Sequence, residues 1–417
     1  MDLERKAKIR QALINHRAAQ FAFLSELIAI ETVHQAGDAG PSSERVAELF
    51  ENSGFVVERI KVVPVPHVKD LQNHEQRTGI KNLIIRHGFG PGPVVALVAN
   101  ADTAPVNGRE KHPPFKSTIE SGVIYGNGAV CKGNIAAYAF ALMALKSANK
   151  GLGGTVELHI TFDGEGDGSE GVQSLLEKPH VNPDTAIASG CVTNIATSGT
   201  GSIELEAEIT GRLNGDATKK PNDALFAVSK VLEALFQEKK RSRQILSDIP
   251  GIGTAELIVT DIKGERGPRT LPEQACVCFK RTVLPDDDPA RIQAQLTRVV
   301  GRASVGAKGV VCKVRRLSLA KAFAPNEAGG ELRRIIKQQA MESLGRDIAE
   351  VGYGGYTDAS HYAKRGIPVL LYGVAPETPD LGDDESLNLD NLRKATEVIA
   401  LGLAEYLEKA YKPAAAS

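Results

Sequence analysis

The first half of the chain alternates between amphipathic helical patterns and short apolar runs. Apolar residues recur at spacings of three and four in "FAFLSELIAI", which predicts a long helix over 7–33. The run "VVALVAN" at 94–100 is almost continuously apolar, as in a strand buried on both faces. Further helices are predicted at 43–54, 136–151 and 171–178, the first with Ser43 as its N-cap. Further strands are predicted at 55–63, 82–88, 155–163 and 185–189. Strands alternating with helices indicate an α/β domain with a mainly parallel sheet.

Between about 200 and 318 the order of the patterns changes. An alternating strand at 202–211 precedes a long helix at 221–240, and two strands follow at 255–264 and 274–285. A helix at 290–304 and a strand at 309–319 complete the order βαββαβ, which is typical of a small ferredoxin-like α+β sandwich. We therefore expect a unit at 200–318 that is inserted into the α/β domain.

After this insert the α/β pattern resumes. Helices are predicted at 331–345, 357–366 and 389–411, and a buried strand at 368–374. Thr357 and Asp358 are the expected N-cap of the short helix that follows them. The predicted organisation is thus an α/β domain in two parts, 1–199 and 319–417, which enclose the inserted domain at 200–318.

Composition and charge exclude several classes of protein. The 417 residues contain 50 Lys and Arg against 51 Asp and Glu, so net charge does not favour nucleic acid or an anionic membrane as a partner. No run is long and apolar enough for a membrane span, and the charged N-terminus does not resemble a secretion signal. Five cysteines, an odd number, are typical of reduced thiols, and we expect a cytoplasmic protein.

Two glycine-rich segments resemble phosphate-binding loops but lack the required chemistry. "GEGDGSEG" has a G-x-G-x-x-G spacing, yet acidic residues crowd the place where a pyrophosphate would lie. "GNGAVCKG" resembles a Walker loop, but Cys131 and Gly133 replace its glycine and its magnesium-binding hydroxyl. A nucleotide-binding protein is therefore a weaker hypothesis than those that follow.

Several ordered segments together resemble the M20 metallopeptidase family, the group of carboxypeptidase G2 and acetylornithine deacetylase. They are "VANADTAPV", "PPFKSTIESGVIYGNGA", "TVELHITFDGEGDGSEGVQSLL", "GGYTDASHYAKRGIPVLLYG" and "DESLNLDNLRKATEVIALGLAEYL". The resemblance covers essentially the whole chain. It implies a zinc-peptidase-like sheet domain with an inserted lid or dimerisation domain, and two metal ions that activate a water for amide hydrolysis.

The positions where the family holds its metals are mostly changed in this chain. The resemblance places the first histidine ligand at Asn100, the aspartate that orients it at Asp102, and the bridging aspartate at Cys131, or at Val130 if the one-residue deletion lies elsewhere. It places the general base at Gly164, further ligands at Glu165, Gly190 and Leu381, and the lid-domain histidine near Gly215. Amide, glycine and alkyl groups are poor zinc ligands, so dinuclear hydrolysis is not expected. We expect no cofactor, with zinc only in a remodelled site.

Cys131 and its surroundings leave other interpretations open. Beside Lys132, Cys131 could be a nucleophile with His361 as a conceivable partner, although a buried inert thiol is the simpler interpretation. Alternatively, residual ligands could hold one metal: Asp102, Glu165, Cys131 and Cys191. The simplest role of Asp102 is to hydrogen-bond the turn after its strand. Cys276 and Cys278 alternate on one predicted strand, and we expect them in a core.

The sequence therefore predicts an M20-like protein with a degenerate metal centre, which works as a non-hydrolytic binding or partner subunit. The rival hypothesis is an amide hydrolase with a mononuclear-metal or Cys131-dependent site. We expect a small-molecule or peptide-like ligand in the cleft between the domains. The resemblance also implies a homodimer through the lid domain, or a heteromer with an active relative.

Overall fold

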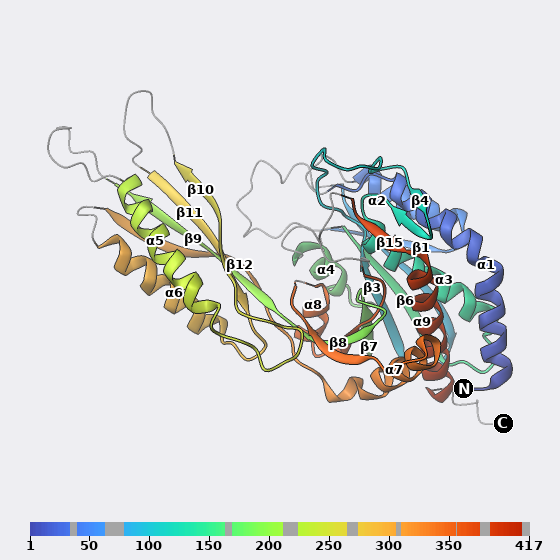
Figure 1. Cartoon of the computed structure of the whole chain (residues 1–417). Coiled ribbons are helices and arrows are strands. Elements are labelled where there is room, and N and C mark those ends of the chain that lie inside the picture. The colour runs from blue at the N-terminus through green and yellow to red at the C-terminus, as the bar shows by residue number, and fades with distance from the viewer. Residues whose placement is uncertain are drawn as a thin grey trace. The chain divides into compact units, whose positions relative to one another are not determined.

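The computed structural model describes residues 1–33, 40–62, 79–162, 169–211, 224–264, 274–305, 310–355, 357–375 and 384–410 (Figure 1). The chain divides into two compact units. Unit 1 comprises Met1–Thr197, Pro325–Glu350 and Thr357–Ser417, and unit 2 comprises Ser198–Ala324 and Val351–Tyr356. Unit 2 includes a second segment, Val351–Tyr356, that lies outside the 200–318 range expected for the insert.

The main sheet has eight described strands in the order β1-β2-β6-β3-β7-β14-β8-β13, of which β8 and β13 end in residues assigned to unit 2 and the rest belong to unit 1. The central strands β6, β3, β7 and β14 are parallel, whereas β1, β2 and β8 pair antiparallel with their neighbours. The strands are β1 (Val57–Lys61), β2 (Lys81–Gly90), β3 (Val94–Asn100), β6 (Gly154–Thr161), β7 (Thr185–Ala188), β8 (Asn194–Gly199), β13 (Ala349–Tyr353) and β14 (Val369–Leu371). The expected mainly parallel α/β sheet is confirmed.

Helices cover both faces of this sheet, because side chains alternate between the faces along each strand. Leu158 and Ile160 of β6 join the apolar core formed with the helices α1, α3 and α9, whereas His159 between them faces α8. The helices of unit 1 are α1 (Leu3–Ala29), α2 (Gly40–Asn52), α3 (Ala129–Ser147), α4 (Ser169–Leu176), α7 (Gly330–Leu344), α8 (Ala359–Lys364) and α9 (Leu389–Ala410), with a short 3₁₀ turn η2 (Glu327–Gly329).

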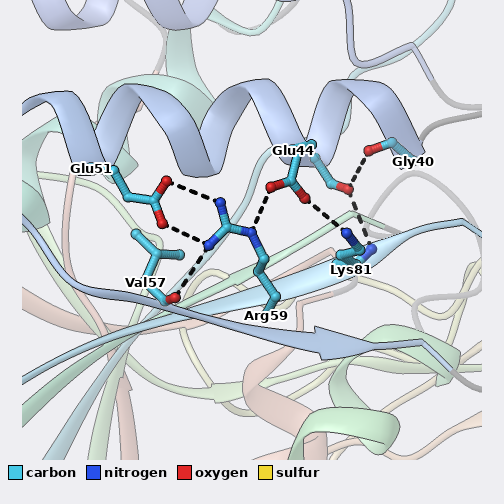
Figure 2. Close-up of polar contacts among 7 residues, drawn as sticks. Gly40, Glu44, Glu51, Val57, Arg59 and Lys81 are labelled. Carbon is cyan, nitrogen blue, oxygen red and sulfur yellow. Dashed lines mark hydrogen bonds and ion pairs between the residues drawn. The ribbon is translucent and has the colours of Figure 1, made fainter.

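A row of charged residues attaches α2 to the edge strand β1 and to its neighbour β2 (Figure 2). Arg59 of β1 bonds Glu44 at 2.7 Å and Glu51 at 2.7 and 3.1 Å, both on α2. Lys81 of β2 binds the other oxygen of Glu44 at 2.8 Å. Ser43 lies within α2 and donates to the carbonyl of Gly40, so the expectation that Ser43 caps this helix is wrong. The helix begins earlier than its apolar pattern suggested.

Two features of unit 1 are absent from the sequence prediction. A small three-stranded sheet pairs β15 (Ser386–Asn388) with β5 (Val123–Tyr125), and β5 with β4 (Thr118–Glu120). The helix α3 begins at Ala129 rather than at 136, so its first turns contain the polar segment Cys131–Asn134. Glu385, the residue before β15, accepts hydrogen bonds from Gly128 and Val130 at the start of α3, so the two features are in contact.

Unit 2 has the expected βαββαβ order. The elements are β9 (Gly201–Thr210), α5 (Ala224–Ser242), β10 (Leu257–Gly264), β11 (Gln274–Val283), α6 (Pro289–Ser304) and β12 (Val311–Ala320). The four strands form an antiparallel sheet in the order β10-β11-β9-β12, which is the strand order of a ferredoxin-like sandwich. Helices α5 and α6 cover one face, where Ile203, Leu205 and Phe279 are buried (Figure 1).

Cys276 and Cys278 do not lie in that core. They pair across the ladder with Glu208 and Glu206, on the face of the sheet that carries the glutamates. Both thiols are half-buried, and burial raises the pKa of each, that of Cys278 to about 11. The expectation of a core position is wrong because β11 uses its alternate residues, such as Val277 and Phe279, for the core.

Candidate functional site

The candidate site lies at the carboxyl end of β3, where the chain leaves the centre of the sheet. Asn100 is the last residue of β3, and its side-chain nitrogen donates to the carbonyl and to Oδ1 of Asp102, both at 3.4 Å. Asp102 is buried, with 2% of its surface exposed. Its carboxylate therefore does bond the turn after the strand, as the simplest interpretation of the sequence held.

Cys131 lies in the first turn of α3, beside this turn. Its sulfur donates to the carbonyl oxygens of Gly128 at 3.5 Å and Asp102 at 3.7 Å, and the residue is half-buried. The structure thus brings together three of the residues that the sequence singled out: Asn100, Asp102 and Cys131. Asn100 and Cys131 both donate to the backbone carbonyl of Asp102.

The amino end of α3 is capped by a residue from a distant part of the chain. Gly128, the residue before the helix, has φ +81° and provides no side chain to cap it. Glu385 supplies the acceptors instead: its carboxylate accepts from the N–H groups of Gly128 at 2.6 Å and Val130 at 3.0 Å. An acidic group is favourable there because the first N–H groups of a helix lack partners and carry partial positive charge. Burial nevertheless raises the pKa of Glu385, against those two hydrogen bonds and the nearby charge of Lys132.

Lys132 is a fully buried cation next to Cys131. Its Nζ donates to the carbonyl of Ile30 at 2.8 Å, just beyond the end of α1. Burial lowers the pKa of Lys132 to about 8, although the charges of Glu385, Asp102 and Glu31 act in the opposite direction. The side chain fits because Gly128 has no Cβ: one built there would lie 3.0 Å from Lys132 Cδ and 2.5 Å from a methyl of Thr103.

Gly190 and Cys191 follow β7, the strand next to β3 in the sheet. A Cβ built on Gly190 would lie 2.6 Å from the backbone carbon of Leu371 and 2.6 Å from the backbone nitrogen of Tyr372. The two backbones are therefore too close to admit a side chain at Gly190. The thiol of Cys191 lies 3.0 Å from the hydroxyl of Thr193.

Asn134 attaches α3 to the segment that follows β14. Its side chain accepts from the N–H of Val374 and donates to the Val374 carbonyl, both at 3.0 Å. A Cβ on Gly373 would lie 1.9 Å from the Asn134 oxygen, so this contact requires the glycine. The first two turns of α3 are thus held by side-chain contacts with Ile30, Val374 and Glu385, none of which the sequence pattern indicated.

His361 belongs to α8, on the opposite face of the sheet from α3. Its neighbours Asp358 and Tyr362 point into a buried polar row on β6: Thr161 donates to Asp358 at 2.9 Å, and His159 Nδ1 lies 2.8 Å from the Tyr362 hydroxyl. Ala359 N–H donates to Thr357 at 3.4 Å, so Thr357 caps the helix as expected, whereas Asp358 makes no such bond. The Asp358 carboxylate binds β6 instead.

The buried row continues to Glu157, whose carboxylate lies 2.8 Å from His159 Nε2 and 2.6 Å from Arg86. Burial opposes ionisation, but these partners hold the pKa of Glu157 below its ordinary value. A signal for this row was present in the sequence: Glu157, His159 and Thr161 alternate within an otherwise apolar strand, which predicts that all three face one side.

Some candidate positions lie outside the described residues: Gly164, Glu165, Gly215 and Leu381. Within the described ranges, no group of three or more His, Cys, Asp or Glu side chains is arranged to hold a metal ion. Among the same residues, no helix is long and apolar enough to cross a membrane.

The chain matches a family of known proteins over most of its length. The model of peptidase family M20/M25/M40 matches residues 96–405. The chain belongs to this family.

Relatives with named activities are distant. The chain is 26% identical over 362 residues to a succinyl-diaminopimelate desuccinylase of Xanthomonas euvesicatoria pv. vesicatoria (strain 85-10), which covers 84% of this chain and 88% of that protein. A desuccinylase of Stenotrophomonas maltophilia (strain K279a) is 26% identical over 335 residues, 77% of this chain and 85% of that protein.

Solved structures share the fold at lower identity. The di-peptidase Dug1p from Saccharomyces cerevisiae has a TM-score of 0.75 at 14% identity, covering 98% of this chain and 99% of its own. The M20 metallo-carboxypeptidase Sso-CP2 from Sulfolobus solfataricus has a TM-score of 0.71 at 16% identity, covering 93% and 99%. These likenesses confirm the M20 fold and define this chain as peptidase-like in architecture.

Proposed function

We propose that this chain is a non-hydrolytic member of the M20 family, a binding or partner subunit whose dinuclear metal centre has been dismantled. The observation that carries the proposal is the contact at Gly190. The resemblance places a carboxylate ligand there, and a Cβ would lie 2.6 Å from the backbone of Leu371 and Tyr372. Backbone atoms, unlike the end of a flexible side chain, cannot move aside. A carboxylate side chain at position 190 would therefore require a shift of β7 or β14.

The contacts of Asn100 and Cys131 support the same proposal. An amide replaces the first histidine ligand, and its nitrogen is directed at Asp102, so the residue that would orient a ligand binds a hydrogen-bond donor instead. The Cys131 thiol donates to two carbonyl oxygens, whereas zinc requires a thiolate that acts as an electron donor. The residues described at these positions do not fit two zinc ions, and we derive no catalytic step through a metal.

The fold still offers a place for a ligand. Binding sites in α/β sheets lie beyond the carboxyl ends of the parallel strands, which in this chain are the ends of β3 and β7. Asn100 and the thiols of Cys131 and Cys191 provide polar groups at these ends, suited to amide and carboxylate groups of a small-molecule or peptide-like ligand. The desuccinylases and peptidases among the relatives act on amide bonds, and an amide-containing ligand is the corresponding proposal here.

The experiment measures hydrolysis and binding together on the purified chain. We expect no turnover of N-succinyl or N-acetyl amino acids or dipeptides, with or without added zinc, while the same compounds in a thermal-shift screen raise the melting temperature. The Dug1p di-peptidase, assayed in parallel, is the positive control for turnover. Zinc-dependent hydrolysis would contradict the proposal, and a screen without any stabilising ligand would contradict its binding part.

A Cys131-dependent hydrolase is the second candidate, because the half-buried thiol lies at a helix amino terminus beside the Lys132 cation. Iodoacetamide distinguishes the two candidates. Labelling of Cys131 at neutral pH with loss of a measurable turnover favours the hydrolase. A chain that shows no turnover, and binds its ligand equally well as Cys131→Ser, favours the binding subunit.

We propose further that two copies associate through unit 2. The edge strand β10 exposes Ile258 and Ile262, 49% and 50%, and the adjacent helix α5 exposes Phe226 and Phe236, 48% and 52%. An exposed edge with apolar side chains invites strand pairing, and a two-fold axis lets the same edge of a second copy complete it. Light scattering should show that the wild type is a dimer and that the double variant Phe236→Glu, Ile262→Lys is a monomer. A monomeric wild type would contradict this proposal. If the partner is instead an active relative, it would appear as a second chain in the purified complex.

A further inference from the structure

Two adjacent acidic residues, Asp384 and Glu385, bind two different segments of unit 1. Glu385 caps α3 through Gly128 and Val130, as described above. Asp384 accepts from the backbone N–H groups of Lys111 at 2.8 Å and His112 at 3.2 Å. Because Asp384 and Glu385 are adjacent in the chain, a shift of the backbone at Asp384 also displaces Glu385 and its cap on α3.

His112 completes the contact with Asp384. Its Nδ1 lies 2.8 Å from the second carboxylate oxygen of Asp384, and its Nε2 lies 3.5 Å from Glu120 at the end of β4. The ring stacks on Tyr125 of β5 with centroids 4.3 Å apart and planes 19° from parallel. The two carboxylates thus flank the ring on its two nitrogens, an arrangement that only the imidazolium, with two N–H groups, satisfies fully.

We propose that His112, Asp384 and Glu385 form a pH-sensitive clasp that fastens the amino terminus of α3, and with it Cys131 and Lys132, to the rest of unit 1. Below the pKa of His112 the imidazolium bridges Asp384 and Glu120, and the clasp is closed. Above it, one nitrogen loses its proton, one of the two contacts loses its donor, and the attraction to both carboxylates disappears. The hold on Asp384 weakens, and the cap that Glu385 places on α3 weakens with it.

The charges around His112 agree with this direction. The groups that face the ring of His112 are Asp384, Glu120 and Tyr125. Lys111 precedes His112 in the chain, and the charge of Asp384 acts to raise the pKa of the nearby Glu110. The hydrogen bond to Asp384 raises the pKa of His112, and the bonds from His112 and Lys111 lower the pKa of Asp384 against its burial. Because the pKa of His112 is raised, its stabilisation of the clasp is complete below the unfolded histidine pKa of about 6.5. This stabilisation is lost as pH rises through the pKa of His112 in the folded chain. Because the pKa of Asp384 is lowered, the stabilisation from its carboxylate is also lost in acid, as pH falls through the folded pKa of Asp384.

Hydrogen exchange measured on the full chain at pH 5.5 and pH 8.5, corrected for the intrinsic exchange rate, tests the clasp without substrate or metal. We expect protection of peptides that cover 107–116 and 126–134 to fall by roughly threefold or more between the two pH values. His112→Gln keeps a donor for Asp384 but does not titrate, so protection of both peptides should become independent of pH. Asp384→Asn should have the same effect, which keeps the test decisive if one variant folds poorly.

His180→Gln is the matched control, because His180 also binds a carboxylate, Glu58 at 2.7 Å, in the same unit. This variant should retain the pH dependence of both peptides. Equal protection of the wild type at the two pH values, or a pH dependence that persists in His112→Gln, would overturn the clasp. A change confined to 107–116 would overturn its connection to α3.

Discussion

The carboxylate of Glu385 accepts a hydrogen bond from the backbone N–H of Gly128 at 2.6 Å, across 257 positions of the chain. This contact caps α3, the helix where the resemblance to the M20 family places the bridging aspartate at Cys131. In this chain the first turn of that helix contains Cys131 and Lys132, and its amino terminus is stabilised by the carboxylate of Glu385.

Removal of the Glu385 carboxylate should destabilise unit 1. Loss of a helix cap costs about 1 kcal/mol, within a range of roughly 0.5–2 kcal/mol. Glu385→Ala should lower the free energy of unfolding by about this amount in urea denaturation. The exposed Glu177→Ala, at the end of α4, serves as the control and should change it little. An unchanged midpoint for Glu385→Ala would show that water replaces the cap at no cost.

Reintroduction of a carboxylate at Gly190 should not restore metal binding. Gly190→Asp places a Cβ 2.6 Å from two backbone atoms, and overpacking of this kind costs about 1–3 kcal/mol. The variant should have a lower melting temperature than the wild type, and added zinc should not raise it. Gly301→Ala is the comparison, because nothing lies within 4 Å of a Cβ there and alanine favours the helix α6. A stable Gly190→Asp variant that takes up zinc would refute the packing argument.

Two buried tyrosines should respond oppositely to the loss of their hydroxyl groups. Tyr362 lies 2.8 Å from His159 in the buried row on β6, so Tyr362→Phe leaves a buried partner unsatisfied at a cost of about 1–3 kcal/mol. The hydroxyl of Tyr372 is equally buried and has no hydrogen-bond partner among the described residues. Tyr372→Phe should therefore be neutral or stabilising. The difference between their unfolding midpoints is the measurement, and equal effects would contradict the role of the row.

The thiol of Cys278 should be slow to alkylate. With burial raising its pKa to about 11, its thiolate fraction at pH 8 is roughly 100-fold smaller than that of an ordinary cysteine. Mass spectrometry of iodoacetamide labelling in the native chain should show this delay, and labelling in guanidinium should remove it. Native labelling of Cys278 at the denatured rate would show that burial does not raise the pKa of this thiol.

The sequence predicted those elements whose pattern is local. The strand β3 has the predicted bounds, 94–100, because a continuous apolar run buried on both faces leaves little choice of structure. The order of elements in unit 2 was predicted because its strands alternate apolar and polar residues, with one face in the core. The start of α3 was missed because "GNGAVCKGN" is polar and rich in glycine, and its helical conformation depends on Glu385, which no local pattern contains.

The site was predictable only in part. The place of Asn100, Asp102 and Cys131 at the end of β3 followed from the family motifs, and their contacts with one another bear out the hydrogen-bonded turn. The burial of Lys132 and the contact of Asn134 with Val374 could not be predicted, because both depend on partners brought in by tertiary packing. Ser43 shows the opposite failure: a good local cap signal was overridden when α2 began earlier.

The metal content of the purified chain tests the dismantled centre most directly. Mass spectrometry of the chain after equilibration with zinc and removal of the excess should give well below one zinc per chain, because amide, thiol and glycine positions at the ends of β3 and β7 do not replace the lost ligands. Two tightly held zinc ions per chain would contradict the account.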